Sequence, residues 1–163
     1  MSSYAESLLD FYGGEVGGEA AYSALLGSAR NAEERLKLGS LLQLETETKA
    51  WLRAPMLAHG VSIEEQTADR DKGLAAAAHF MPLSWSEQMQ RLHDFIAAEF
   101  VPRYQTYADS ARARGKPDEE AICLYMVEHE KAQLEFARRE LKGARLDASL
   151  EPIVRFLKYP LKR

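Results

Sequence analysis

Four glutamates occupy positions from which they could do chemistry together. Each lies midway along a segment whose apolar residues recur at helical spacing; they are Glu19, Glu45, Glu99 and Glu128. A glutamate surrounded by leucines is costly unless it is protonated, paired or bound to a metal ion. Carboxylates that meet inside a bundle repel one another, and a bound cation removes the repulsion. Since hard oxygen ligands suit iron or manganese, the pattern indicates a metal or proton site at the centre of a helical bundle.

A histidine stands beside the last of these acids. His129 follows Glu128 within the apolar stripe of its segment, so it is a further candidate metal ligand. Ordinary interpretations stay open for both residue types. His129 fits a packed or hydrogen-bonded core histidine better than it fits a ligand. The glutamates are compatible with surface ion pairs at i, i+4 spacing, namely Glu99 with Arg103 and Glu45 with Lys49.

Six helical segments are predicted to position these residues. Their boundaries follow from N-cap residues, capping boxes and glycine or proline stops. They span residues 3–29, 32–58, 63–78, 84–113, 118–142 and 148–159. The expected N-caps of the second to fifth segments are Asn31, Ser62, Ser84 and Asp118. No strand-type alternation of any length occurs, so the sequence predicts an all-α fold.

Glycine and proline residues interrupt two of the long segments. The first segment contains Gly13, Gly14, Gly17 and Gly18, whose paired spacing either lets a neighbouring helix approach closely or marks a bend. The fourth segment contains Pro102, which removes one backbone hydrogen bond and is expected to bend the helix axis at about Ala98.

The lengths of the connections predict the topology. The first two long helices are joined by a few residues near Asn31, and the last two by a few near Gly115, so each pair is antiparallel. A connector of roughly twenty-five residues between the pairs is long enough to run the length of a bundle. We therefore expect one domain over residues 1–163. Its core is a four-helix bundle over about 3–142 with one long crossover carrying a short helix, and residues 143–163 add a short C-terminal helix.

The helix order and the acidic motifs resemble the ferritin-like superfamily, in particular its rubrerythrin-type and di-iron members. GGEAAYSALL at residues 17–26 is similar to the first metal helix of that family, and AAEFVPRYQTYA at residues 97–108 is similar to its third. The second and fourth family helices carry Glu-x-x-His. Here the matching positions read Glu45-Thr-Glu-Thr48 and Glu128-His-Glu-Lys131, so all four carboxylates match and both histidines are replaced.

The resemblance implies a ferritin-like antiparallel bundle with a di-iron or di-manganese centre and oxygen or peroxide chemistry. Two changes would compensate for the lost histidines. His129 serves as ligand with Met126 in the lost carboxylate's place, or Glu15, one turn before Glu19, joins the first helix's contribution. The replaced ligands also indicate an altered or lost centre, in which Lys131 or Arg103 neutralises the acids.

Composition restricts the partners. With 46% hydrophobic and 28% charged residues the chain has enough apolar material for a core, and a net charge of -4 without a basic stripe argues against nucleic acid. No window reaches the length of a membrane span, and the N-terminus lacks the features of a signal peptide. We expect a cytoplasmic protein and a homodimer. The single cysteine, Cys123, is expected to be a core residue.

Two other functions stay open. One is a non-catalytic binding or scaffold bundle, which binds no metal and tolerates glutamine at Glu45 and Glu128. The other is a heme-oxygenase-like bundle, whose small-molecule pocket is lined by Tyr22, Tyr125 and Met126 without converging carboxylates.

Overall fold

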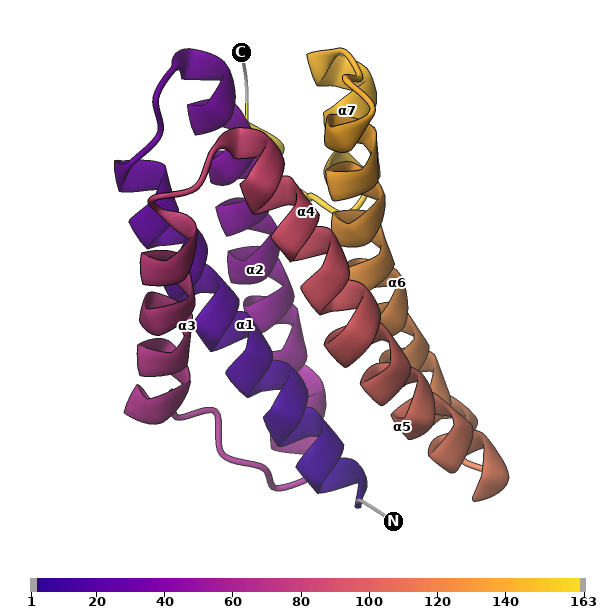
Figure 1. Cartoon of the computed structure of the whole chain (residues 1–163). Helices are drawn as coiled ribbons and strands as arrows, with labels where there is room; N and C mark the ends of the chain where they lie inside the picture. Colours follow the sequence, from indigo (N-terminus) through magenta and orange to yellow (C-terminus); the bar gives the residue numbers. More distant parts are fainter. Residues whose placement is uncertain (1–2, 162–163) are drawn as a thin grey trace.

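Helices and short connections make up the whole of the computed structural model, which describes residues 3–161 (Figure 1). No strand occurs within that range, so the all-α prediction is confirmed. The helices are α1 (Tyr4–Gly27), α2 (Ala32–Ala58), α3 (Thr67–Phe80), α4 (Trp85–Phe95), the π-helical turn η1 (Ile96–Phe100), α5 (Val101–Ala113), α6 (Pro117–Leu141) and α7 (Leu146–Val154).

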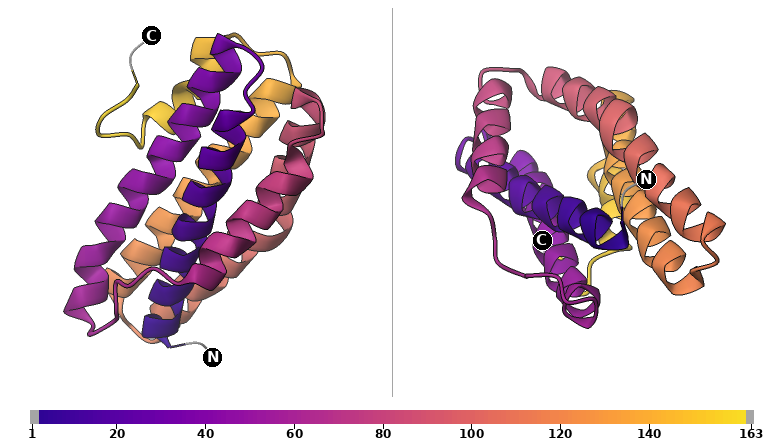
Figure 2. Two further views of the ribbon diagram at one scale, coloured as in Figure 1. Left: turned by 90° about the vertical axis from the view of Figure 1, so that its left-hand side faces the viewer. Right: turned by 90° about the horizontal axis from the view of Figure 1, so that it is seen from below.

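The long helices run side by side (Figures 1 and 2). Helices α1 and α2 form one hairpin, and α4, η1 and α5 continue as a single rod that forms a second hairpin with α6. The connection between the hairpins carries α3, which packs along α1 on the outside of the first hairpin. The C-terminal α7 lies against α6 and α2. The crossover helix α3 therefore lies beside α1, the first helix of the chain.

The helix ends follow the predicted caps in part. Asn31 caps α2 by accepting a hydrogen bond from the amide of Glu34, and Ser84 caps α4 in a capping box. The predicted start of α3 is wrong by four residues. Ser62 accepts from the amide of Glu64 instead of capping a helix, and residues 61–66 stay irregular up to Thr67.

The last two helices also begin earlier than predicted. Pro117 is the first residue of α6 and Lys116 its N-cap, because proline fits the first helical position without losing a hydrogen bond; Asp118 then lies in the first turn instead of capping it. Helix α7 begins at Leu146 and ends at Val154, before the predicted 148–159 range is complete.

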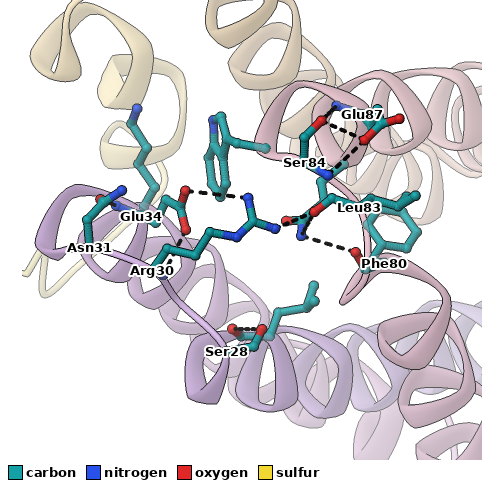
Figure 3. A network of polar contacts seen from close by, with 12 residues as sticks. Ser28, Arg30, Asn31, Glu34, Phe80, Leu83, Ser84 and Glu87 are labelled. Carbon is teal, nitrogen blue, oxygen red and sulfur yellow. Dashed lines mark hydrogen bonds and ion pairs between the residues drawn. The ribbon is translucent and has the colours of Figure 1, made fainter.

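Arg30 ties the α1–α2 turn to the end of the crossover (Figure 3). Its guanidinium donates to the carbonyl oxygen of Leu83 and lies 3.9 Å from Oε1 of Glu34. Ser84 and Glu87 complete their capping box beside this contact. The turn of the first hairpin and the start of the second are thereby held together at one end of the molecule.

The glycines of α1 allow close approach, as one of the two predicted alternatives required. Helix α3 crosses α1 at Gly17 and Gly73, where a Cβ on Gly73 would lie 2.7 Å from the carbonyl carbon of Gly17. A Cβ on Gly18 would lie 2.7 Å from Cδ of Glu45 on α2. Carbon atoms do not normally come closer than about 3.5 Å, so a side chain at either position would displace a neighbour.

The perturbation predicted at Pro102 takes the form of a π-helical turn. Over Ile96–Phe100 the backbone N–H of Val101 bonds the carbonyl of Ile96, five residues back. Such a turn holds about one residue more than an α-helical turn, so every later side chain is rotated by about 100° about the axis. The buried positions run from Ile96 to Tyr104 and Ala108 rather than through Glu99.

The interior consists of two hydrophobic clusters with a polar layer between them. One cluster contains Tyr22, Leu44 and Phe136, and the other contains Phe11 and Met126 together with Cys123, which is buried as predicted. On α1, α2 and α6 the residues between the two clusters are largely polar and buried; they include Glu15, Glu45, Thr48, His129, Glu130 and Gln133. The long helices thus carry a polar layer across the middle of the bundle.

Within residues 3–161, no helix is both long enough and apolar enough to cross a membrane.

Candidate metal centre

Three helices bring one metal-binding side chain each to the polar layer. Glu15 comes from α1, Glu45 from α2 and His129 from α6, and their exposed fractions are 1%, 3% and 0%. Nε2 of His129 lies 3.4 Å from Oε1 of Glu15 and 3.4 Å from Oε1 of Glu45. One potential ligand atom from each residue lies within 4.8 Å of the other two.

These separations suit a common metal ion. Metal–nitrogen and metal–oxygen bonds in protein sites are about 2.1 Å long, so two ligands at a tetrahedral angle are about 3.4 Å apart. The two histidine–glutamate distances therefore match one edge each of a coordination polyhedron without a change of backbone. Oε2 of Glu15 is buried and has no hydrogen-bond partner among the described residues. An unpartnered buried carboxylate oxygen is costly, and a cation would satisfy it.

Hydrogen bonds fix the orientation of the imidazole. Nδ1 of His129 lies 3.1 Å from Oγ1 of Thr48 on α2, and Nε2 lies 3.0 Å from the amide nitrogen of Gln133, one turn further along α6. The amide nitrogen of Gln133 can only donate, so this contact is favourable when the His129 proton is on Nδ1. The lone pair of Nε2 then accepts the Gln133 N–H, and a metal ion at this position would take that lone pair in place of the amide.

Gln133 is itself held in place by two neighbours. Its amide nitrogen donates to Oε1 of Glu45 at 2.8 Å, and its amide oxygen accepts from the hydroxyl of Tyr22 at 2.6 Å. The tyrosine is on α1, so this chain of bonds links α1, α6 and α2 through one amide. The amide of Gln133 thus holds Glu45 and His129 in place without a metal, through the same two atoms that a metal ion would bind.

The layer holds an excess of acid. Burial raises the pKa of Glu15 well above its usual range, and the charges of Glu45 and Glu130 and a side-chain hydrogen bond with Glu45 raise it further. Burial raises the pKa of Glu130 to about 8, although the charge of His129 opposes this. Burial lowers the pKa of His129, but the hydrogen bond and charge of Glu45 reverse the effect and raise it overall. Protons therefore neutralise this layer unless a metal ion takes their place.

Glu130 and Gln133 are the two polar residues of this layer that sequence reasoning missed. Glu130 is buried, and its Oε1 lies 4.0 Å from Nε2 of His129. Gln133 lies four residues after His129, so helical spacing places the two side chains on the same face of α6, and that spacing was the available signal. Glu130 follows His129 directly, so the predicted stripe gave no reason to prefer it to Glu128.

The structure does not bring Glu19, Glu99 and Glu128 into the centre. Glu19 is half-buried and accepts hydrogen bonds from Lys49 and Thr46, which lower its pKa despite partial burial. Glu99 is exposed because the π-helical turn rotates it out of the face it was expected to share with Ile96. The prediction that Glu19, Glu99 and Glu128 converge at the centre is wrong.

Glu128 points outward for a different reason. Because α6 turns His129 and Glu130 toward the interior, the residue before them lies on the outer face, and 59% of the Glu128 side chain is exposed. There it pairs with Lys131 at 2.8 Å. The alternative in which Lys131 neutralises the central acids is therefore wrong as well, and Arg103 pairs with Asp10 at 2.9 Å.

A cavity of about 380 Å³ reaches the centre from one side. It is lined by α1, α3 and the α4–η1–α5 rod, and its polar lining includes Tyr22, Glu45, Glu130 and Gln133. Tyr125 and Met126, which were predicted to line a pocket with Tyr22, are not among its lining residues. The pocket contains carboxylates, which differs from the carboxylate-free pocket of the heme-oxygenase-like alternative.

Comparison with known proteins identifies no relative: no family model matches the chain, and no curated protein and no solved structure matches it.

Proposed function

We propose that this protein binds one divalent iron or manganese ion at Glu15, Glu45 and His129. The observation that carries the proposal is the approach of three buried ligand atoms to within one coordination polyhedron, with Oε2 of Glu15 left without a hydrogen-bond partner. Two carboxylates and one imidazole form a mixed oxygen and nitrogen set, which suits these metals. Once bound, iron or manganese would supply one-electron chemistry toward oxygen or peroxide.

The surrounding residues support a reactive site as well as a structural one. Thr48 and Gln133 orient the imidazole, and the cavity gives a small molecule a path to the side of the centre lined by Glu130. Structural metal sites are usually closed, whereas catalytic sites keep a position free for water or substrate. Three protein ligands beside a cavity correspond to the second kind.

The ferritin-like assignment belongs to the same proposal. Two antiparallel hairpins joined by a long crossover are the arrangement of that superfamily, and the ligands come from the middle of long helices, as in its members. The ligand set differs from that implied by the resemblance, since three residues converge where a di-metal centre uses six. We therefore propose a divergent, mononuclear member.

Metal content tests the proposal directly. The protein is purified without chelators, and iron, manganese and zinc are measured by mass spectrometry, followed by titration of the metal-free protein with Mn²⁺. We expect about one ion per chain, and a loss of Mn²⁺ affinity of at least about tenfold in Glu15→Gln and in His129→Ala.

The matched controls are Glu128→Gln and Glu99→Gln, which remove acids of the same type from the outer faces of α6 and η1. They should bind Mn²⁺ like the unaltered protein. A protein that is folded by circular dichroism and takes up no iron or manganese, natively or on titration, would refute the proposed function.

The non-catalytic scaffold is the second candidate, because the polar layer also satisfies itself in part without a metal. Tyr22, Gln133 and Glu45 form a continuous chain of hydrogen bonds that ends on His129 and Thr48. The scaffold predicts that Glu45→Gln changes the unfolding temperature equally with and without added Mn²⁺. The metal proposal predicts that Mn²⁺ raises the unfolding temperature of the unaltered protein and does not raise that of Glu45→Gln.

A further inference from the structure

The cavity beside the polar layer has apolar walls and an acidic inner end. Its walls come from α1, α3 and the α4–η1–α5 rod, and they include Ala21, Leu25, Phe80, Leu92, Ile96 and Phe100. Leu9 and Phe95, which are about half exposed, also line it and continue the apolar surface outward. At the other end lie the buried carboxylates of Glu45 and Glu130. A ligand that fills the cavity is therefore apolar over most of its length and polar at one end.

The charges of the lining decide the sign of that polar end. Four acids and two bases line the cavity, which gives a formal charge of −2. Both bases are paired with acids of the lining, Lys72 with Asp69 at 3.1 Å and Arg103 with Asp10 at 2.9 Å. Neither base forms an ion pair with the inner carboxylates, although the charge of Arg103 acts on Glu130 from its pair with Asp10. When Glu130 is ionised, an anionic ligand is repelled and a cationic one attracted.

We propose that the cavity binds a small apolar primary amine, with its hydrocarbon part against the walls and its ammonium group at Glu130. This inference rests on the proposed metal site, since the ion takes Glu15 and Glu45 as ligands and leaves Glu130 as the inner acid without a bound cation. An ammonium group there donates charge-assisted hydrogen bonds to the carboxylate and places the carbon that bears the nitrogen beside the metal centre.

The volume limits the size of the amine. An engineered protein cavity of about 150 Å³ holds one benzene ring. The cavity here has about 380 Å³, so it has room for one aromatic ring and a short chain that ends in an amine. 4-Phenylbutylamine is a suitable probe. 4-Phenylbutan-1-ol has nearly the same shape without the charge, and 4-phenylbutyrate has the opposite charge.

Binding of the three probes is measured by isothermal titration calorimetry on Mn²⁺-loaded and on chelator-treated protein, at one pH. We expect the loaded protein to bind the amine about tenfold more tightly than the alcohol and to bind the carboxylate least, because a hydrogen bond to a charged group is worth more than a neutral one. Glu130→Gln should remove the preference for the amine and leave the affinity for the alcohol nearly unchanged.

Two further variants test separately whether binding depends on the space in the cavity and on the acid at position 130. Ala76→Trp places a large side chain on an exposed position of the cavity lining and should weaken all three probes. Glu128→Gln, which removes an outer acid two residues from Glu130, should leave every affinity unchanged. Equal binding of the amine and the alcohol, an amine preference that persists in Glu130→Gln, or no binding of any probe at millimolar concentration would each overturn the proposal.

Metal content, measured on the same samples, keeps the two proposals distinguishable. A protein that binds Mn²⁺ but shows no amine preference refutes the amine site and leaves the metal site intact. A protein that binds no metal but prefers the amine, with the preference lost in Glu130→Gln, supports the acid-ended cavity and refutes the proposed function alone.

Discussion

Replacement of Gly18 by alanine tests whether the close approach of α1 to Glu45 is needed for metal binding. The new Cβ would lie 2.7 Å from Cδ of Glu45 and closer still to its Oε2. Ordinary carbon–carbon contact begins near 3.5 Å, so the carboxyl carbon would have to move by about 0.8 Å. Metal–ligand distances tolerate changes of only about 0.2 Å, so Glu45 would be lost as a ligand.

The effect on stability should be much smaller than the effect on binding. Alanine favours a helix over glycine by about 1 kcal/mol, whereas displacement of Glu45 breaks its hydrogen bond with Gln133, which costs about 1–3 kcal/mol when the partner stays buried. These terms nearly cancel, and we expect the metal-free variant to unfold within about 2 kcal/mol of the unaltered protein. Its Mn²⁺ affinity should fall by about a hundredfold.

The assay pairs Mn²⁺ titration with urea unfolding of the metal-free protein. Gly27→Ala is the matched control, since a Cβ at Gly27 would meet nothing within 4 Å, and it should leave Mn²⁺ affinity unchanged. Normal Mn²⁺ affinity in Gly18→Ala would refute the assignment of Glu45 as a ligand. A large loss of stability with no folded protein would instead show that Glu45 cannot move at all.

Three further outcomes are expected. The pKa values of Glu15, Glu130 and His129 are all raised, so their contribution to stability is complete at acid pH and is lost as pH rises through the shifted values. Urea unfolding of the metal-free protein should therefore show a loss of a few kcal/mol between about pH 4.5 and 8, at about 1.4 kcal/mol per pKa unit, and Mn²⁺ should abolish this loss. A rise in stability over that pH range would contradict the prediction. Mn²⁺ binding should release protons, so its affinity should increase with pH, as a pH-indicator dye would record. Gly73→Ala would force α3 away from the backbone of α1 and should lower the unfolding temperature by several degrees, whereas unchanged stability would show that the contact is loose.

The sequence was sufficient for the positions that depend on helix period alone. The bounds of α2, the short turns of both hairpins and the long crossover follow from caps and connection lengths, and Glu45 follows from its place in a regular apolar stripe. Glu15 and His129 were the two alternative replacements proposed for the missing histidines. The structure places these two side chains side by side at the centre.

The missed features depend on packing that periodicity does not describe. The π-helical turn adds a residue before Pro102, and no apolar pattern records that addition, so Glu99 was assigned to the wrong face. In α6 the sequence Glu-His-Glu offers two acids beside one histidine, and only the orientation of the helix against α1 and α2 selects Glu130 over Glu128. Helix α3 begins later than predicted because Ser62 accepts a hydrogen bond within the connection and Glu65 pairs with Lys49.

The packing of α3 has a kinetic consequence. Gly73 and Ala77 are its two buried residues, so the helix lies closely along α1 at Gly17 but places few side chains in the interior. Segments with few buried contacts open first in native proteins, and their amide protons exchange with solvent at rates far above those of the long helices. Since α3 forms one wall of the cavity, its transient detachment would set the rate at which a bulky guest enters or leaves, independently of how tightly that guest is held.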